Sequence, residues 1–547
     1  MTPAVGGWPR LLPLGDRGLL VEFGAEVSPE VNALVRGAEP LLARLPGVCE
    51  TVPAFRSLLL VYDPVRTTFD RLAEQAEAVA RGAGPAPDDG GRFHEIPVAY
   101  GDGWGPDLDA VAAALGMPAA EVIRLHAATP YRVYMLGFSP GFPYLGLLPE
   151  ALRLPRRATP RTRVPAGSVA IADAFTGIYP QDTAGGWHLL GRTPLRLFDP
   201  LRPSPFLLAP GDRVRFVPAP AFAVGPTVGP TEEPPLAVPR RPVFEVVEPG
   251  LMTTIQDAGR PGWRRFGVPV SGPMDRQAHA AANLAVGNTP GEAALEMTFP
   301  GPKLRAVADA VVAVAGADLG ARLNQTDLEP GQPVRVRRGD LFTLTAPRSG
   351  QWLYLAVAGG IDGPEVLGSR ATWTRGGPRG PLGRPVRAGE LLGVREGSAG
   401  PRRARPTPAI PRGRRTLTVR VVLGPQADAF APEGLAAMLG GIFEVTVQRD
   451  RSGARLRGVP VRHRVGADIA SDGLLPGAVQ VPADGGPVVI FADGPTTGGY
   501  TKAAAVVSVD LDALAQLAPG DRVRFEAVTV AQAHALLRAV QEEVGCS

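Results

Sequence analysis

The sequence contains very little cysteine and very little lysine. Only Cys49 and Cys546 occur in 547 residues, which excludes a disulfide framework and a cysteine-based zinc site. Of the 57 basic residues only Lys303 and Lys502 are lysines, and the other 55 are arginines. A lysine kept in such a chain can mark a place that needs a compact ammonium group, although chance is the simpler explanation for either one alone.

Long apolar runs and an excess of one charge are also missing. No segment has the length of a membrane span, and the N-terminus lacks the basic-then-apolar pattern of a secretion signal. A net charge of +4 gives no reason to expect nucleic-acid or membrane binding. We therefore expect a soluble cytoplasmic protein with no nucleic-acid or membrane partner.

Glycine and proline, in contrast, are abundant. The 68 glycines and 60 prolines follow no period, which indicates many tight turns between short strands. Residues 218–242 hold eight prolines and predict a semi-rigid linker. Residues 398–415 hold six arginines without an acid or an aromatic residue, which favours a second solvated linker over a nucleic-acid site.

Residues 1–92 predict a small α/β domain of ferredoxin-like type. Residues 18–62 alternate strand, helix, strand and strand, and a second amphipathic helix follows at about 68–81. Ser28 and Pro29 are typical of a helix N-cap and the first helical position. Short strands dominate the rest of the chain, apart from two helical stretches near residues 107–115 and 118–128.

An internal repeat is the strongest indication of the architecture. The eight residues Ala209–Phe216 recur unchanged as Ala518–Phe525, and Arg387–Leu392 is a weaker third version. An apolar strand that ends in a Gly turn or an Asp lies upstream of each copy. One match would mean little, but three ordered matches separated by linkers indicate three related β-barrels. We expect a mainly β chain with an α+β part, divided as follows: 1–92 (ferredoxin-like), 93–217 (barrel), 218–242 (linker), 243–397 (barrel), 398–415 (linker) and 416–547 (barrel).

Three motifs of the first half share a frame of glycines and prolines: Gly137–Gly146, Val164–Val169 and Gly185–Pro194. Proline fixes φ near about −65° and glycine allows close approach of a backbone or ligand, so the frame predicts a rigid loop followed by a site wall. These motifs resemble the signature of the allophanate hydrolase subunit 1 family, which includes KipI and the B subunit of 5-oxoprolinase.

Five motifs of the second half resemble the companion family, allophanate hydrolase subunit 2, which includes KipA and the C subunit of 5-oxoprolinase. They are Gly250–Arg260, Gly272–Asp275, Ala282–Asn288, Leu367–Arg370 and Thr496–Tyr500. The two resemblances cover nearly the whole chain. They imply a fusion of two subunits that normally associate, and that the barrels are cyclophilin-like.

The resemblance implies three alternative functions. The first is an ATP-dependent amidohydrolase component that, with a separate A subunit, opens 5-oxoproline to L-glutamate. The second is a carboxyltransferase component of a urea-carboxylase-like system, with biotin carried by another protein because this chain has no Met-Lys-Met site. The third is a non-catalytic KipI/KipA-type regulator of a histidine kinase. ATP comes from the resemblance alone, since no phosphate-loop motif occurs, and a homo-oligomer stays open.

The turn from Asp493 to Lys502 predicts the main anion site. It offers two hydroxyls, a glycine pair with free amides, a tyrosine and one of the two lysines. Amides and a compact cation suit a phosphate or carboxylate, whereas a polar turn that satisfies its own backbone is the alternative. We take Asp493 and Lys502 as candidate catalytic residues and expect Lys502 to be exposed, so that its removal would leave folding almost unchanged.

His188 and Arg192 are the candidate catalytic residues of the first half. His188 can act as a general acid or base, with a structural histidine as the equal alternative, and Arg192 can clamp a carboxylate or phosphate oxygen. The remaining histidines show no metal-ligand spacing, so no metal is expected. Phe175 and Pro495 stand where both families have a Gln, which leaves the substrate open.

The other candidates flank the same turns and are expected to bind the substrate or the nucleotide. In the first half they are Ser139, Phe142, Ser168, Tyr179, Gln181 and Trp187. In the second half they are Gln256, Asp257, Arg260, Met274, Asp275, Asn283, Thr496, Thr497, Gly498, Gly499 and Tyr500. Asp275 also fits the N-cap of a helix over residues 276–286, which is the simpler role.

Overall fold

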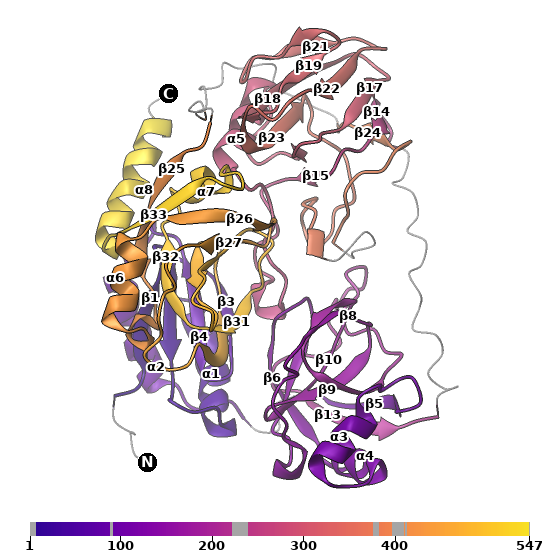
Figure 1. The fold of residues 1–547 in the computed structure, drawn as a ribbon, viewed down its shortest axis with the longest axis vertical. Coiled ribbons are helices and arrows are strands. Elements are labelled where there is room, and N and C mark those ends of the chain that lie inside the picture. Colours follow the sequence, from indigo (N-terminus) through magenta and orange to yellow (C-terminus); the bar gives the residue numbers. More distant parts are fainter. Residues whose placement is uncertain are drawn as a thin grey trace.

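The computed structural model describes residues 7–87, 91–220, 239–375, 382–395, 410 and 413–545. Most of the two predicted linkers lies outside these residues, so both stay predictions. Figure 1 shows an N-terminal sheet with two helices (indigo), a first barrel (purple), a middle region (pink) and a C-terminal barrel (orange to yellow). In the described part of the chain, no helix combines the length and the apolar character needed to cross a membrane.

The N-terminal part is a four-stranded antiparallel sheet with two helices, in the order β1-β2-β4-β3. Both helices and three of the four strands are predicted from the sequence. Helix α1 begins where the sequence indicates, because Ser28 accepts a hydrogen bond from the backbone N–H of Val31 at 3.2 Å and Pro29 is the first helical residue. Strand β1 is not predicted from the sequence. The elements are β1 (Arg10–Leu14), β2 (Gly18–Glu22), α1 (Pro29–Leu42), β3 (Val48–Pro53), β4 (Ser57–Tyr62) and α2 (Phe69–Gly82).

Both faces of this sheet are buried, which explains its continuously apolar strands. Leu19 and Val21 pack against the two helices. Leu20, between them, points to the other face and shares an apolar cluster with Leu474 and Ala505 of the C-terminal barrel. The start of the chain therefore packs against its end, and Figure 1 shows the N-terminal sheet lying behind the C-terminal barrel.

The first barrel is closed, with seven strands in the order β5-β12-β9-β10-β7-β6-β13. The pair that closes it, β5 and β13, is parallel. A two-stranded ribbon of β8 and β11 lies beside it. The elements are β5 (Phe93–Tyr100), α3 (Leu108–Leu115), α4 (Ala119–Ala128), β6 (Tyr131–Leu136), β7 (Pro143–Gly146), η1 (Glu150–Leu152), β8 (Arg161–Val164), β9 (Ser168–Ala172), β10 (Phe175–Ile178), β11 (Thr183–Gly185), β12 (His188–Arg192) and β13 (Arg213–Pro218).

The C-terminal barrel has the same topology, β25-β32-β29-β30-β27-β26-β33, with the parallel pair β25 and β33 and the ribbon β28 and β31. Every strand number exceeds its counterpart by 20, so two of the three predicted barrels are confirmed as like barrels. The elements are β25 (Thr416–Leu423), η5 (Ala427–Ala429), α6 (Pro432–Gly440), β26 (Phe443–Arg449), β27 (Gly453–Arg457), β28 (Asp468–Gly473), β29 (Ala478–Gln480), β30 (Val488–Ile490), β31 (Thr497–Tyr500), β32 (Lys502–Val506), α7 (Leu511–Ala515), β33 (Arg522–Ala527) and α8 (Val530–Gly545).

The repeated Ala-Pro-Gly-Asp segment has the same structural role in both barrels. Asp212 accepts hydrogen bonds from the backbone N–H groups of Arg92 and Ala209, both at 2.9 Å. Asp521 accepts the two equivalent bonds at 3.1 and 2.9 Å. Each carboxylate thus joins the turn before the last strand to the start of the first strand, its parallel neighbour. The repeat stabilises barrel closure.

The middle region does not close into a third barrel within the described residues, so that prediction is wrong there. It forms a six-stranded sheet, β20-β19-β22-β17-β14-β24, and a five-stranded sheet, β15-β16-β23-β18-β21, which share one apolar core. Helix α5 covers the outer face of the five-stranded sheet through Ala278 and Ala282. The two sheets enclose this core without strand pairing between them among the described residues.

The elements of the middle region are β14 (Pro242–Glu248), β15 (Thr253–Gln256), η3 (Arg264–Phe266), α5 (Arg276–Ala285), β16 (Ala294–Met297), β17 (Lys303–Ala306), β18 (Ala310–Asp318), β19 (Ala321–Leu323), β20 (Thr326–Asp327), β21 (Val334–Val336), β22 (Leu341–Leu344), β23 (Ser349–Val357) and β24 (Leu391–Gly393).

Candidate functional site at the junction of the two halves

Residues 256–275, here called the junction segment, leave the middle region and contact both barrels. Gly141 of the first barrel donates its backbone N–H to the carbonyl of Phe266 at 2.8 Å. Arg451 of the C-terminal barrel donates Nη2 to the carbonyl of Gly272 at 2.6 Å. In Figure 1 the pink trace of this segment descends from the middle region toward the first barrel. The segment therefore joins the two halves of the chain.

The junction segment also binds the N-terminal sheet. The buried guanidinium of Arg264 pairs with Glu50 at 3.1 Å, and Arg265 pairs with Glu39 at 3.0 Å. Both carboxylates are almost fully buried, which makes these pairs less screened than surface pairs. One short segment thus contacts all four folded parts.

Equivalent hairpin loops of the two barrels approach this segment from two sides. They are residues 137–142, between β6 and β7, and residues 450–452, between β26 and β27. The first loop also reaches the other barrel, because the backbone N–H of Phe138 donates to Oγ1 of Thr497 at 3.1 Å. Gly137 is needed for this approach, since a Cβ there would lie 2.2 Å from the same hydroxyl oxygen. The predicted loop and the predicted Thr497 do come together.

A fully buried charge cluster fastens the second loop. Nε and Nη2 of Arg451 each donate to Asp493 at 3.0 Å, and Nη1 donates to Glu296. All three side chains are 0% exposed. Burial alone would lower the pKa of Arg451, but the two carboxylates raise it above its usual value. Asp493, expected to act on a substrate, is therefore held by an arginine that the sequence analysis does not single out.

Met274 and Asp275 support the same cluster through their backbones. Glu296 accepts the backbone N–H of Met274 at 2.8 Å and the hydroxyl of Tyr354 at 2.7 Å. The Tyr354 oxygen in turn accepts the backbone N–H of Asp275 at 2.8 Å. The Asp275 carboxylate caps helix α5, the simpler of its two predicted roles, and burial together with the nearby Asp512 raises its pKa to about 6.

Gln256, Asp257 and Asn283 hold backbone groups around the segment. The Gln256 side chain donates to the carbonyl of Thr372 at 3.0 Å, and Asn283 donates to a backbone carbonyl at 2.8 Å. Asp257 accepts the backbone N–H of Arg370 at 2.6 Å. These three predicted residues shape the junction segment and its neighbours.

Arg260 is buried but only partly paired. It is 1% exposed, and Nη2 donates to the carbonyl of Ala371. Its Nε and Nη1 have no hydrogen-bond partner in the described structure. Burial lowers the pKa of Arg260 to about 10, against the opposing effect of Asp493 and Asp257. The group stays charged at neutral pH.

Three hydroxyls from the same meeting point are also buried without a partner among the residues described. They belong to Ser139 of the first barrel loop, Ser271 of the junction segment and Thr496 of the C-terminal barrel. A buried polar group without a partner needs an explanation, of which a functional role is one. Other such atoms lie elsewhere in the described structure, but these three belong to segments that meet the junction segment or form part of it. The junction of the two halves is therefore the candidate functional site.

Three aromatic candidates of the first half, Phe142, Tyr179 and Trp187, form a packed cluster. Phe142 contacts Tyr179 and Trp187 edge to face, with ring centroids 5.1 and 5.5 Å apart, and all three are at most 7% exposed. Ser168 is also buried, and its carbonyl accepts the backbone N–H of Tyr179 at 2.9 Å. Gln181 carries a buried Oε1 without a partner in the described structure. The cluster stiffens the barrel behind loop 137–142.

The structure gives His188 and Arg192 protein partners. His188 Nε2 lies 2.9 Å from the carbonyl oxygen of Pro155. Arg192 donates Nε to the carbonyl of Ala166 at 2.7 Å, and its guanidinium lies 5.9 Å from the centre of the Trp104 ring. None of these contacts involves the junction segment, so any catalytic role for the pair stays a prediction.

Lys502 is not exposed, and that expectation is wrong. Its side chain is 0% exposed and forms an ion pair with Asp472, which is itself 4% exposed. Burial raises the pKa of Asp472, against the effect of the lysine. Gly498 and Gly499 lie in strand β31 rather than in an open turn, and a Cβ at Gly498 would lie 2.6 Å from the Gln480 side chain. Tyr500 is 42% exposed.

Arg451, Glu296 and Asp472 are the main residues that sequence reasoning misses. Arg451 is one of 55 arginines, and its partners lie 42 and 155 positions away. It lies at the tip of the β26–β27 hairpin, which the sequence analysis does not predict. Where the chain is described, no group of His, Cys, Asp and Glu side chains could hold a metal ion.

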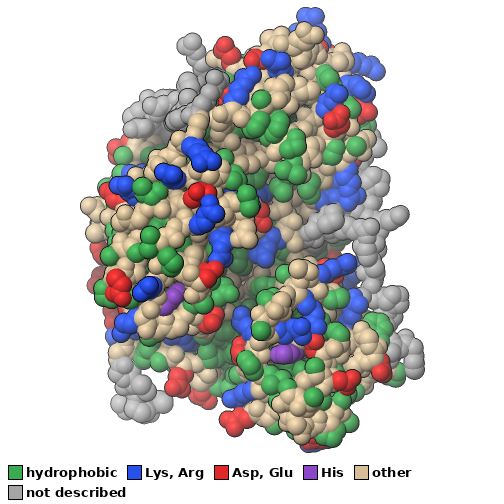
Figure 2. Space-filling model, in the orientation of Figure 1, with side chains coloured by type: hydrophobic (Ala, Val, Ile, Leu, Met, Phe, Trp, Pro, Cys, Tyr) green, Lys and Arg blue, Asp and Glu red, His purple; other side chains and the backbone are tan. Residues whose placement is uncertain are grey.

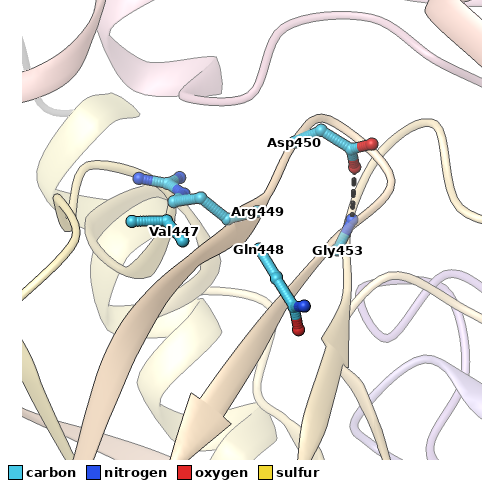
Figure 3. A pocket seen from close by; sticks show the side chains of 5 residues that line it. All are labelled: Val447, Gln448, Arg449, Asp450 and Gly453. Atoms are coloured by element: carbon cyan, nitrogen blue, oxygen red, sulfur yellow. Dashed lines mark hydrogen bonds between the residues drawn. The ribbon is translucent and has the colours of Figure 1, made fainter.

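A pocket of about 380 Å³ lies beside the hairpin of β26 and β27 (Figure 3). Its lining is Val447, Gln448, Arg449, Asp450 and Gly453. None of these is a predicted site residue. The Arg449 guanidinium already donates to the carbonyl oxygens of Ala515, in helix α7, and of Leu517, which follows the helix. Figure 2, drawn in the orientation of Figure 1, shows a face hollowed near its middle, where the two barrels and the middle region meet, with Lys and Arg side chains around the hollow.

Two family models match the chain. The carboxyltransferase domain, subdomain C and D, matches residues 9–208, and the carboxyltransferase domain, subdomain A and B, matches residues 266–527. The chain is 42% identical over 212 residues to the 5-oxoprolinase B subunit of Escherichia coli O157:H7, covering 38% of this chain and 94% of that protein. It is 33% identical over 301 residues to the 5-oxoprolinase C subunit of Escherichia coli K12, covering 55% of this chain and 95% of that protein. The chain belongs to the carboxyltransferase-domain family.

It is a fusion of the two carboxyltransferase modules, homologous to the B and C subunits of 5-oxoprolinase, as the sequence motifs indicate. The crystal structure of TTHA0988 shares its fold at 40% identity and a TM-score of 0.80, covering 93% of this chain and 99% of that one. The urea amidolyase of Kluyveromyces lactis matches at 31% identity and a TM-score of 0.51, over 56% of this chain and 20% of that one.

Proposed function

We propose that this carboxyltransferase-domain protein is the fused B and C component of an ATP-dependent 5-oxoprolinase. It would open the lactam of 5-oxoproline to L-glutamate together with a separate A-type 5-oxoprolinase protein. The observation that carries the proposal is that this single chain covers 94% of one B subunit of the enzyme and 95% of one C subunit. The junction segment supports it, because residues of both halves meet there and neither half forms that site alone.

The chemistry needs donors in a water-poor place. A lactam is resonance-stabilised, so its opening requires an activated oxygen and stabilisation of developing negative charge. The junction offers the buried guanidinium of Arg260 and the hydroxyls of Ser139, Ser271 and Thr496. ATP would supply the activating phosphoryl group. The predicted phosphate turn is occupied by the Lys502–Asp472 ion pair, so we expect the partner protein to hold most of the nucleotide.

The test is reconstitution. The purified chain and an A-type 5-oxoprolinase protein are incubated with ATP and 5-oxoproline, and glutamate and ADP are measured. We expect turnover with both proteins and little or none with either alone. Full ATP-coupled turnover by this chain alone would contradict the need for a partner, and no turnover with any A-type protein would contradict the proposed substrate.

A carboxyltransferase component is the second candidate. It is favoured by the similarity to the urea amidolyase of Lachancea kluyveri, 35% over 306 residues, which covers 52% of this chain and 17% of that protein. Here the chain would accept a carboxyl group from carboxybiotin on a separate carrier. Transfer of labelled carboxyl from a carboxylated carrier to urea, measured with this chain present and absent, separates the two candidates.

A further inference from the structure

Arg260 has a charge that no carboxylate of the described structure neutralises directly. Its neighbour in the junction segment, Arg264, is also buried but forms an ion pair with Glu50 at 3.1 Å. Arg451 binds two carboxylates. Arg260 instead has one backbone acceptor and two nitrogens, Nε and Nη1, without a partner. The junction segment thus contains two buried arginines, of which Arg264 has a carboxylate partner and Arg260 has none in the described structure.

The nearest acids are already used. Asp493 accepts two bonds from Arg451 and one from the hydroxyl of Thr374 at 2.9 Å. Asp257 accepts the backbone N–H of Arg370 and the hydroxyl of Ser369. Both acids favour the charged form of Arg260 from a distance without accepting its free N–H groups. The guanidinium is kept charged, and its donors are kept free.

Such an arrangement costs stability. Burying a donor without an acceptor is unfavourable by an amount comparable to a lost hydrogen bond, and more for a charged group. Folded proteins violate this rule mainly where function requires it. The unpaired Ser271 hydroxyl belongs to the residue next to Val270, whose carbonyl accepts the backbone N–H of Arg260 at 2.8 Å. Donors without acceptors therefore meet at one place.

We propose that Arg260 binds the carboxylate of a small monoanionic ligand at the junction of the two halves. One unpaired positive charge matches one negative charge. A phosphate dianion carries a second negative charge that Arg260 would not balance and that the carboxylates of Asp493 and Asp257 would repel. 5-Oxoproline is a carboxylate of this class, so the inference deepens the proposed function. The inference rests on the proposed function only where it names 5-oxoproline as the ligand.

The test measures binding to the full chain by calorimetry, with four probes: 5-oxoproline, acetate, inorganic phosphate and 2-pyrrolidinone, the same lactam without the carboxylate. Arg260→Met should weaken 5-oxoproline and acetate binding roughly ten- to hundredfold, because one charge-assisted contact is lost. It should leave 2-pyrrolidinone unaffected and leave Tm unchanged or higher, because the unpaired donors are removed. Arg260→Lys provides a second variant that keeps the charge and should weaken binding by a smaller factor.

Arg264→Met is the matched control, because it removes a paired arginine of the same segment. It should lower Tm without changing carboxylate affinity. If acetate binding depends on Arg260 but 5-oxoproline does not bind, the inference stands and the proposed substrate fails. The inference is overturned if the Arg260 variants bind both carboxylates as the wild type does, if 2-pyrrolidinone loses as much affinity, or if phosphate is the probe that depends on Arg260.

Discussion

Arg451 and Asp493 form a bidentate ion pair that is completely buried. The pair connects the β26–β27 hairpin to the turn that leads into strand β31. A third group, Glu296 of the middle region, completes the cluster. The middle region and the C-terminal barrel are therefore joined by charge as well as by their shared apolar cluster. The cluster also fixes Gly272 and thereby one end of the junction segment.

Replacing Arg451 by methionine should strongly destabilise the protein. The change leaves two carboxylates buried without their cation, and breaking a buried pair in this way costs about 3–5 kcal/mol. The free energy of unfolding from urea titrations measures the effect. Arg457→Ala is the control, because its pair with Glu444 is largely exposed and should contribute less than about 1 kcal/mol. Equal losses in the two variants would contradict a special role for the buried cluster.

Replacing Lys502 by alanine should also destabilise the protein, by about 3–5 kcal/mol, because Asp472 would remain buried without its partner. The melting temperature and the urea midpoint measure this. Lys303→Ala, whose pair with Glu248 is exposed at 3.7 Å, should change stability by less than about 1 kcal/mol. If Lys502→Ala melted like the wild type, the lysine would not be held in the barrel as described.

The two barrels could be predicted from sequence because their evidence is local. Asp212 and its copy Asp521 each accept backbone N–H groups from a residue three positions earlier and from the adjacent strand. The same eight-residue sequence therefore gives the same structure. The family motifs were equally informative, since each is a continuous stretch. The weaker copy at Arg387–Leu392 overstates the likeness of the middle region, where helix α5 covers one sheet.

The partners of the site residues could not be predicted in the same way. Lys502 looked exposed because lysine usually is, and nothing in the sequence links it to Asp472, 30 positions earlier. Nothing in the sequence links Asp493 to Arg451 either, because Arg451 lies 42 positions earlier in another hairpin. Which polar residue is satisfied and which is not depends on contacts between distant segments, and only the folded chain shows them.

His126 should make stability depend on pH. It lies in the first barrel, between the hydroxyls of Tyr100 and Thr176, and burial lowers its pKa from 6.5 to about 3. The unfolded chain therefore binds more protons than the folded one between these values. The stability contributed by neutral His126 is complete above about pH 6.5 and is lost as the pH falls toward 3, at about 1.4 kcal/mol per pH unit.

Urea titrations from pH 7 to pH 4 measure this slope. His126→Gln should be less stable at pH 7, because the ring also stacks on Phe216, but its stability should fall less steeply with decreasing pH. An unchanged slope in the variant would show that other groups carry the dependence.

Cutting the chain within residues 221–238 should leave its two halves together. The N-terminal sheet packs on the C-terminal barrel, and Asp16 accepts the backbone N–H of Ser508 at 3.0 Å while its carbonyl oxygen lies 2.9 Å from Nε2 of His534. A chain with a protease site in this range should elute after cleavage as one species of about the original 57.1 kDa. Two separated species would mean that the fusion itself holds the halves in place.

Gly267 should be essential for docking the first barrel loop on the junction segment. It has φ of +79°, and a Cβ there would lie 2.5 Å from the carbonyl oxygen of Ser139. Gly262, in the same segment, has φ of +94° but no heavy atom within 4 Å of such a Cβ. The two Gly→Ala variants therefore share the strain of a positive φ, about 1–2 kcal/mol, and differ only in the contact with Ser139.

Gly267→Ala should displace loop 137–142 and expose the backbone N–H groups of Phe138 and Gly141 to hydrogen exchange. Under the proposed function it should also reduce ATP-dependent 5-oxoproline turnover, assayed with the A-type protein, at least about tenfold, since a 1 Å misplacement can cost that much or more. Gly262→Ala should show a similar small loss of stability, normal exchange in loop 137–142 and near-normal turnover. Equal turnover in the two variants would show that contact between the two halves at Ser139 does not matter for activity, and the site would then have to lie elsewhere.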